Sequence, residues 1–524
     1  MKKNLSYSAV LFVLLCALLP LAFSQAAGQK RSKKLPSQMQ PASSASPGTT
    51  PERSDKDKEE YRKAMEDADQ KIEAEVKAHS ELVKNLDYLS TQIGSRLTGS
   101  PQMQAASDWT AKRFHDYGID AHLETTQIAH GWQRGLDTAS ILSPISRSIE
   151  IRSFGWDKPT NGLVTGPVVF VNAKTPQDLE QYKGKLKGAI VLPREPATLR
   201  DQDKAPNAYD AVIPPAKGVP KEQMSFRQQF QMLKMLADEG AAIILLDSDK
   251  ADNLFNMAGG FNNYNPPDVP LAFISHEEYS LIYRLQKAGP VTMNFELKGK
   301  LSDGPVPASI TVAEIKGSEF PDQRVIIGGH LDSWDLGQGS LDNGTGAMAV
   351  LEAARTLKAL NWKPKRTLTF ILFTGEEQGG VGANLFLKNH EAEIPKIDAI
   401  LVHDTGTGRV FSIALERLYE TGPLMSEIYR PLQEVFDLDP MSGEYFSGSD
   451  HVEFLHKGVP GYFCVQNVAD YGNAHHSQSD TFDKVIPDEI NEGAAVLAAW
   501  MWNVSEMPPA LPHHPEVKST GLMD

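Results

Sequence analysis

Residue types that bind metal ions are concentrated in one stretch of the chain, from Val325 to Arg355. His330, Asp332, Asp335 and Asp342 lie there among several glycines. Imidazole and carboxylate groups are the ligands that zinc and similar divalent ions take in proteins. The same residues would also suit a solvated acidic loop. The stretch alone therefore leaves a metal site and an ordinary loop equally open.

The local pattern of this stretch predicts the elements that would position the polar residues. The apolar run Val325–Ile327 precedes them and predicts a strand, and the helix-forming run Ala347–Arg355 follows them. Strand, polar loop and helix form the unit of α/β folds, in which ligands gather at the carboxyl ends of the strands.

Three later apolar runs have the same form, because acidic or histidine side chains follow each of them. The four predicted strands are Val325–Gly329, Thr367–Phe373, Ala399–Val402 and Pro460–Val465. Helical patterns alternate with them. We therefore predict an α/β fold with a mainly parallel (mixed) central sheet that is flanked by helices.

Parallel strands place their carboxyl ends at one edge of a sheet, so residues that follow different strands are expected to meet there. These residues are His330, Asp342, Glu376, Glu377, Asp404 and His476. Five ligands with one shared carboxylate would supply three ligands to each of two ions. Paired ions about 3.5–4 Å apart suit hydrolysis. The pattern thus favours a dinuclear metal site.

Residues 1–27 have the pattern of an export signal. Lys2 and Lys3 precede an apolar run from Ala9 to Phe23, and a small-x-small sequence follows it. The run is shorter than a membrane span requires. We predict cleavage near Ala27, a periplasmic or secreted protein, and no stable membrane insertion after cleavage. An uncleaved anchor is the alternative.

The charge of the chain limits its partners. The formal net charge is −15, and cleavage of the signal would make it more negative, because two lysines would be removed. Such an acidic protein is a poor partner for nucleic acid or for anionic membrane surfaces. Cleavage would also leave Cys464 as the sole cysteine, so no intrachain disulfide is expected.

Six short sequences resemble the motifs of peptidase family M28. They are GGHLDSWD at 328–335, LDNGTG at 341–346, FTGEEQGGVGA at 373–383, HDTG at 403–406, GSDHVEF at 448–454 and HHSQSDT at 475–481. The resemblance extends over roughly residues 77–507. It implies a zinc-exopeptidase fold and two zinc ions as the cofactor.

The resemblance also implies a ligand set. His330 and Asp404 would bind one zinc ion. Glu377 and His476 would bind the other, and Asp342 would bridge both. The family spacing selects His476 rather than its neighbour.

Two further roles follow from the same resemblance. Glu376 would be the general base, taking a proton from the attacking water and delivering it to the leaving amine. Asp332 would hydrogen-bond the His330 imidazole and fix its tautomer.

The implied activity is hydrolysis of the terminal bonds of short peptides or dipeptides by a metal-bridging hydroxide. The resemblance favours a dipeptidase or carboxypeptidase, and an aminopeptidase of the same family is the alternative. An acyltransferase of the glutaminyl-cyclase type and a non-catalytic receptor-like relative are more remote, because all five ligands and the base are present. A peptide substrate is the implied partner, and formation of a homodimer stays open.

Residues 140–299 differ from the rest, with short β-type runs between loops that contain Pro and Gly. This segment resembles a protease-associated (PA) domain, and we expect it to shape the mouth of the site; an ordinary structural insertion is the alternative. We predict that a signal peptide at 1–27 and a disordered linker at 28–57 precede the folded part. The peptidase domain consists of two segments, 58–139 and 300–507, and the PA-like domain at 140–299 lies between them. A tail at 508–524 ends the sequence. The first peptidase segment should open with a surface helix from Lys58 to Leu89.

Overall fold

The computed structural model describes residues 53–173, 176–199, 226–260, 263–446 and 448–515. The predicted signal peptide and most of the predicted linker lie outside these residues. Within the described ranges, no helix is long and apolar enough to cross a membrane.

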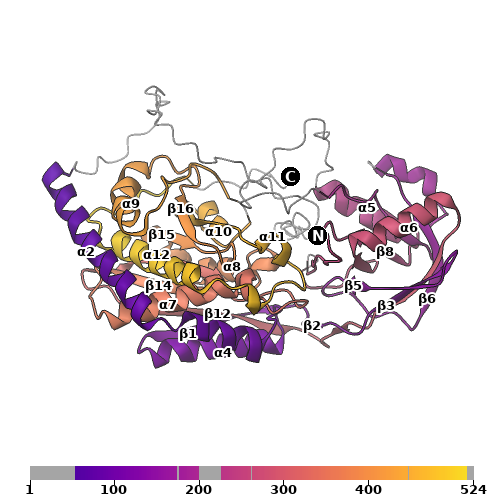
Figure 1. Ribbon diagram of the computed structural model, residues 1–524, viewed down its shortest axis with the longest axis horizontal. Helices are drawn as coiled ribbons and strands as arrows, with labels where there is room; N and C mark the ends of the chain where they lie inside the picture. The colour runs from indigo at the N-terminus through magenta and orange to yellow at the C-terminus, as the bar shows by residue number, and fades with distance from the viewer. Residues whose placement is uncertain (1–52, 174–175, 200–225, 261–262, 447, 516–524) are drawn as a thin grey trace, which may run out of the picture.

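Seven strands form the central sheet, in the order β1-β12-β14-β13-β15-β17-β16 (Figure 1). They are β1 (Asp120–Ile128), β12 (Val306–Ile315), β13 (Phe320–His330), β14 (Arg366–Phe373), β15 (Ile397–Val402), β16 (Val410–Ala414) and β17 (Gly461–Gln466). Strands β14, β13, β15 and β17 run parallel, and the outer strands pair antiparallel. The four predicted strands are thus the parallel centre, and the mixed α/β class is confirmed.

Helices cover both faces of this sheet. On one face lie α2 (Asp55–His79), α3 (Leu82–Asp87), α4 (Pro101–Asp116), α7 (Thr345–Ala359), α9 (Gly422–Phe436) and α12 (Pro487–Glu506). The other face carries α8 (Val381–Asn389) and α10 (His451–His456). Neighbouring strand residues alternate between the two cores, as Ile326 and Ile327 do, because successive side chains of a strand point to opposite faces.

Helix α2 corrects two predictions. It begins at Asp55, because the Ser54 hydroxyl accepts a hydrogen bond from the main-chain N–H of Asp57. The prediction of a disordered linker is therefore wrong for the last residues of 28–57. The prediction of one surface helix from Lys58 to Leu89 is wrong in its bounds, because α2 ends at His79 and a second helix, α3, begins at Leu82. Helix α2 itself exposes one side and buries apolar residues such as Ile72 and Val76 on the other.

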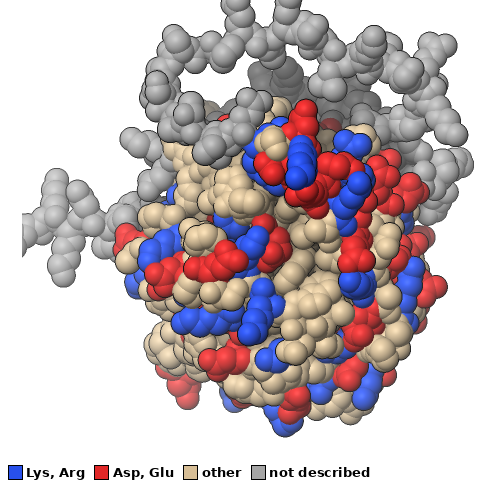
Figure 2. All heavy atoms as spheres, turned by 90° about the vertical axis from the view of Figure 1, so that its left-hand side faces the viewer, with Lys and Arg blue, Asp and Glu red and all other residues tan. Residues whose placement is uncertain are grey.

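The opposite side of α2 carries exposed charged residues. Pairs such as Lys71 with Asp67 and Lys77 with Glu73 are four residues apart along the helix. Figure 2 looks at the molecule from the left-hand side of Figure 1, where α2 lies, and acidic and basic side chains are interspersed over this face. Helix α2 is thus amphipathic rather than polar all round.

A second sheet of eight strands has the order β4-β3-β10-β6-β7-β8-β9-β5. Its strands are β3 (Thr138–Ser143), β4 (Arg147–Ile149), β5 (Ile151–Ser153), β6 (Val164–Phe170), β7 (Ile190–Leu192), β8 (Ile243–Asp247), β9 (Leu271–Ile274) and β10 (Thr292–Glu296). Helices α5 (Phe226–Asp238) and α6 (His276–Ala288) belong to the same region, on the right of Figure 1. The chain enters and leaves it beside the short antiparallel pair β2 (Trp132–Gln133) and β11 (Lys300–Leu301).

Cys464 lies in β17 and is the only cysteine of the described chain. Its side chain is fully buried in the core of the central sheet, and burial raises the pKa of the thiol. A buried thiol of this kind behaves as a small apolar side chain.

Candidate metal centre

The side chains of the six residues predicted to converge are buried at one edge of the central sheet. His330 ends β13, and Asp404 follows β15 by two residues. Asp342 lies in the η4 segment (Ser340–Gly344), directly before α7. The remaining residues are Glu376 and Glu377 in the turn η5 (Glu376–Gln378) after β14, and His476 just after α11 (Tyr471–Ala474).

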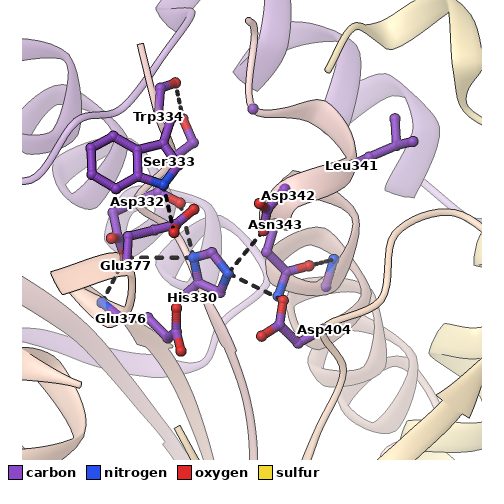
Figure 3. Close-up of polar contacts among 12 residues, drawn as sticks. His330, Asp332, Ser333, Trp334, Leu341, Asp342, Asn343, Glu376, Glu377 and Asp404 are labelled. Carbon is purple, nitrogen blue, oxygen red and sulfur yellow. Dashed lines mark hydrogen bonds and ion pairs between the residues drawn. The ribbon is translucent and has the colours of Figure 1, made fainter. Parts of the chain in front are cut away.

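His330 faces two carboxylates with one side of its ring (Figure 3). Its Nε2 atom lies 3.2 Å from Oδ1 of Asp404 and 3.4 Å from Oδ1 of Asp342. On the other side, Nδ1 lies 3.0 Å from the main-chain oxygen of Asp332. Because a carbonyl oxygen only accepts hydrogen bonds, Nδ1 carries the proton there, and Nε2 of a neutral ring is left to bind a cation.

Asp332 holds the imidazole in a different way from the one expected. Its carboxylate Oδ1 is 3.6 Å from Nδ1 of His330, farther than its main-chain oxygen. The carboxylate instead accepts hydrogen bonds from the Thr98 hydroxyl at 3.2 Å and from the main-chain N–H of Glu376 at 3.3 Å. Asp332 therefore connects the histidine-bearing strand to the turn that carries the two glutamates.

His476 forms the counterpart of His330 on the other side of Asp342. Its Nε2 atom is 2.9 Å from Oε2 of Glu377 and 3.7 Å from Oδ2 of Asp342. The indole N–H of Trp334 donates to the same Glu377 oxygen at 2.7 Å. The two carboxylate oxygens of Asp342 thus face the two imidazoles, one each.

The residues at this edge fit a site for divalent cations. Among the described residues, Oδ2 of Asp342 and Oε1 of Glu377 are buried without a hydrogen-bond donor. Burial raises the pKa of Glu377 well above its usual range, and the nearby Asp342 charge adds to the effect. Buried carboxylates without partners are costly, and bound cations remove that cost. Ligand atoms of His330, Asp342 and Asp404 all lie within 4.8 Å of one another.

His475 lies at the site beside His476. It groups with Asp342 and His476 within 4.8 Å, and its ring stacks on that of His476 with 3.7 Å between centroids. Of the two histidines, His476 is the one that contacts Glu377.

Glu376 is buried beside the candidate ligands and points toward His330 and Asp404 in Figure 3. Burial raises the pKa of its carboxyl group well above the usual range. The His330 charge opposes this rise, whereas the Asp404 charge adds to it. A carboxylate with a raised pKa takes up a proton more readily, as a general base must.

Two buried residues that the sequence reasoning did not single out hold the loop that carries Asp342. The guanidinium group of Arg96 donates to the main-chain oxygens of Leu331 at 2.6 Å and Gly339 at 2.6 Å. Asp480 accepts hydrogen bonds from the main-chain N–H groups of Leu341 at 2.6 Å and Asp342 at 3.1 Å. Asp480 lies within the HHSQSDT sequence, which was a usable signal, whereas no local pattern marks Arg96.

Asp335 is turned away from the cluster, although it shares the motif of His330. Its two carboxylate oxygens accept hydrogen bonds from Nε and Nη2 of Arg134, at 2.6 Å and 3.0 Å. Arg134 also donates to the main-chain oxygen of Ser153, in β5 of the second sheet, at 2.7 Å. Through Arg134, Asp335 thus links the loop after β13 to the second sheet.

The fold and this cluster define a metal-dependent hydrolase of the mixed α/β type. The sequence model of peptidase family M28 matches residues 311–501. Carboxypeptidase Q from Xenopus laevis is 30% identical over 442 residues, which cover 83% of this chain and 88% of that protein. The chain belongs to peptidase family M28, and it is a metallo-exopeptidase.

Solved structures agree with this assignment. The peptidase M28 precursor from Shewanella amazonensis SB2B is 26% identical, with a TM-score of 0.71, over 87% of this chain and 100% of that one. A zinc aminopeptidase from Bacillus subtilis, BSAP, shares the fold at 18% identity, with a TM-score of 0.61 over 80% of this chain and 94% of that chain.

Proposed function

We propose that the chain is an exported dinuclear zinc exopeptidase. In this assignment, His330 and Asp404 hold one ion. Glu377 and His476 hold the other, and Asp342 bridges them. The observation that carries the proposal is the placement of Asp342, whose two oxygens face the Nε2 atoms of two different histidines at 3.4 Å and 3.7 Å.

When bound, zinc ions at these positions would polarise the scissile carbonyl and activate water. The residues of the chain supply the proton transfers. Glu376 takes the proton of the attacking water and passes it to the leaving amine. Its neighbour Glu377 is assigned to an ion together with His476 and accepts a hydrogen bond from Trp334, so Glu376 is the carboxylate left for this task.

The proposed substrates are short peptides, with dipeptidase or carboxypeptidase activity favoured over aminopeptidase activity. Support comes from the likeness to carboxypeptidase Q over most of both chains. We further propose export through residues 1–27, and a peptidase domain (58–139 and 300–507) interrupted by a PA-like domain at 140–299. The separate eight-stranded sheet supports the division, which takes its boundaries from the sequence.

Metal content and turnover together test the proposal. The purified protein should contain two zinc ions per chain and hydrolyse dipeptides. A chelator should abolish turnover, and added zinc should restore it. Full activity in demonstrably metal-free protein would refute the mechanism. A single ion with cyclisation of amino-terminal glutamine would favour the acyltransferase alternative.

A further inference from the structure

A loop of the second sheet reaches the candidate metal centre. It follows β8 and spans residues 248–256. The main-chain N–H of Phe255 donates to the Gln478 side-chain oxygen at 2.9 Å, and the Gln478 amide donates to the main-chain oxygen of Asn253 at 3.1 Å. Because Gln478 lies two residues after His476, these bonds attach the loop to the segment that carries a candidate ligand.

Lys250 extends from this loop to the same segment. Its Nζ atom donates to the main-chain oxygen of Gly472 at 2.8 Å. The preceding residue, Tyr471, donates its hydroxyl to Oδ1 of Asp342 at 3.2 Å. Lys250 therefore binds Gly472, and the adjacent residue Tyr471 contacts the proposed bridging carboxylate directly.

The ammonium group of Lys250 lies at the boundary between protein and solvent. The residue as a whole is half-buried, and burial around its charged end lowers the pKa of Lys250 to about 8, against the opposing charges of Asp342 and Asp470. The hydrogen bond to Gly472, whose neighbour Tyr471 contacts Asp342, places the positive charge in the region of the candidate ligands.

Within the described part of the chain, Lys250 forms no ion pair with a carboxylate. The neighbouring Asp249 is not available, because Arg194 contacts both of its oxygens at 2.6 Å. An ammonium group has three N–H donors, and Gly472 takes one of them. A positive charge with unused donors is thus held beside a site for peptide hydrolysis.

We propose that Lys250 binds the free α-carboxylate of the substrate and so directs the enzyme to dipeptides and to carboxyl-terminal residues. The inference rests on the proposed function. In a substrate whose last residue is the leaving group, the carboxylate lies only about 3–4 Å from the scissile carbonyl carbon. A cation that binds it must therefore lie close to the metal centre, and Lys250 is connected to that region through Gly472 and Tyr471. The second sheet would then supply a specificity residue rather than only a cover.

The alternative is that Lys250 only fastens the loop to α11 through Gly472. The two roles differ in what they recognise. A fastening lysine would affect every substrate alike, whereas a carboxylate-binding lysine would affect only substrates with a free carboxyl end.

The test compares alanyl-alanine with alanyl-alaninamide on the zinc-loaded enzyme. The variants are Lys250→Met, which removes the charge, and Lys250→Arg, which keeps it. Lys234→Met is the matched control, because this exposed lysine of α5 pairs with Asp238 at 3.2 Å, away from the site. Thermal unfolding of each variant reports whether it is folded.

Lys250→Met should raise KM for alanyl-alanine by about 10- to 100-fold, the usual effect of losing a hydrogen bond to a charged group, with a small change in kcat. Its KM for the amide should stay within about twofold of wild type, and Lys250→Arg should retain most of the preference for the free carboxylate. Calorimetric binding of alanyl-alanine to the Glu376→Gln protein, without turnover, should weaken by the same factor when Lys250→Met is added.

Three outcomes would overturn the inference. Equal losses on both substrates in Lys250→Met would reduce Lys250 to a fastening residue. Equal hydrolysis of peptide and amide by the wild type, a result that needs no variant, would also reject it while the proposed function stands. Hydrolysis of neither compound nor of any other dipeptide by zinc-loaded wild type would reject the proposed function together with the inference.

Discussion

The two halves of the candidate metal centre are built in different ways. The half with His330 and Asp404 rests on two adjacent parallel strands, β13 and β15, whose pairing fixes the separation of the two residues. The half with Glu377 and His476 rests on the turn η5 and on a loop. Trp334 and the loop at 248–256 brace this second half through side-chain contacts. We call them the strand half and the loop half.

A peptidase must retain its metal ions and recognise its substrate, and the two halves suit these requirements differently. The strand half depends on main-chain hydrogen bonds of the sheet, which substitutions of side chains leave in place. The loop half depends on side chains that come from both sheets, so it is open to adjustment by the region that also faces the substrate. We therefore expect metal retention to be more robust in the strand half, and specificity to be set at the loop half.

The largest effect on turnover should come from Glu376, which belongs to neither half as a ligand. Glu376→Gln keeps the shape of the side chain but removes its ability to accept a proton. General acid–base catalysis contributes about 10²–10⁴-fold, so kcat should fall by at least about 10². Two zinc ions per chain should remain, as measured by elemental analysis.

Glu377→Ala is the matched comparison, because it changes the adjacent residue of the same type. It should lower zinc content toward one ion per chain, with the remaining ion in the strand half. If Glu376→Gln loses an ion while Glu377→Ala keeps both, the roles of the two glutamates are reversed.

Trp334→Phe tests the bracing of the loop half. Phenylalanine keeps an aromatic ring against His476 but loses the N–H that donates to Glu377 at 2.7 Å. Loss of a hydrogen bond to a metal ligand typically weakens affinity by about 10- to 100-fold. Competition with a chromogenic chelator should show this loss for one ion and near wild-type affinity for the other. Equal weakening of both ions would mean that the halves are not independent.

Thr98→Val makes a similar change on the side of the strand half. It removes the hydroxyl that donates to Asp332 at 3.2 Å, while the N–H of Glu376 still donates to the same carboxylate. We expect a loss of about 1–3 kcal/mol in the free energy of unfolding, because a buried acceptor loses one donor. Zinc affinity should change less than in Trp334→Phe; a larger change would show that the strand half needs side-chain support after all.

The smallest effect on activity is expected at Asp69, on the buried side of α2 and far from both halves. Burial raises its pKa to about 8, against a hydrogen bond from the Asn503 amide at 3.1 Å. Because the folded state holds this proton more tightly than the unfolded state, its contribution to stability is complete below about pH 4 and is lost as the pH rises toward 8.

Asp69→Asn should therefore flatten the fall in the free energy of unfolding between about pH 4 and pH 8, while kcat/KM stays near wild type. Urea unfolding at several pH values measures the free energy of unfolding, and dipeptide turnover measures kcat/KM. An unchanged pH profile would show that Asp69 ionises normally inside the fold.

The parallel centre and its polar edge could be predicted from sequence because each strand is a continuous apolar run with a polar residue at its end. Strand order was not needed, since parallel strands share an edge whatever their order. Strand β1 was missed because its residues alternate between exposed and covered positions, so it has no continuous apolar run. The end of α2 at His79 was missed because Ser80 and Glu81 follow it, and neither is a helix-breaking Gly or Pro.

Parts of the site had no local signal at all. Arg96 acts through main-chain oxygens of a distant loop, and Lys250 is a single lysine in a turn. Only the folded chain brings either of them to the cluster. The motif also could not show which atom of Asp332 accepts the hydrogen bond from His330. A spacing of two residues suits both the carboxylate and the main-chain oxygen of Asp332.

The buried thiol of Cys464 has a practical consequence for studying the loop at 248–256. A thiol that is shielded by the core and has a raised pKa reacts slowly with alkylating reagents. A cysteine introduced at an exposed position of that loop, such as Asp252, would then be the one fast-reacting thiol of a chain that starts after the signal. A fluorophore attached there would report substrate binding as a change in emission, in real time and without mutating the native cysteine.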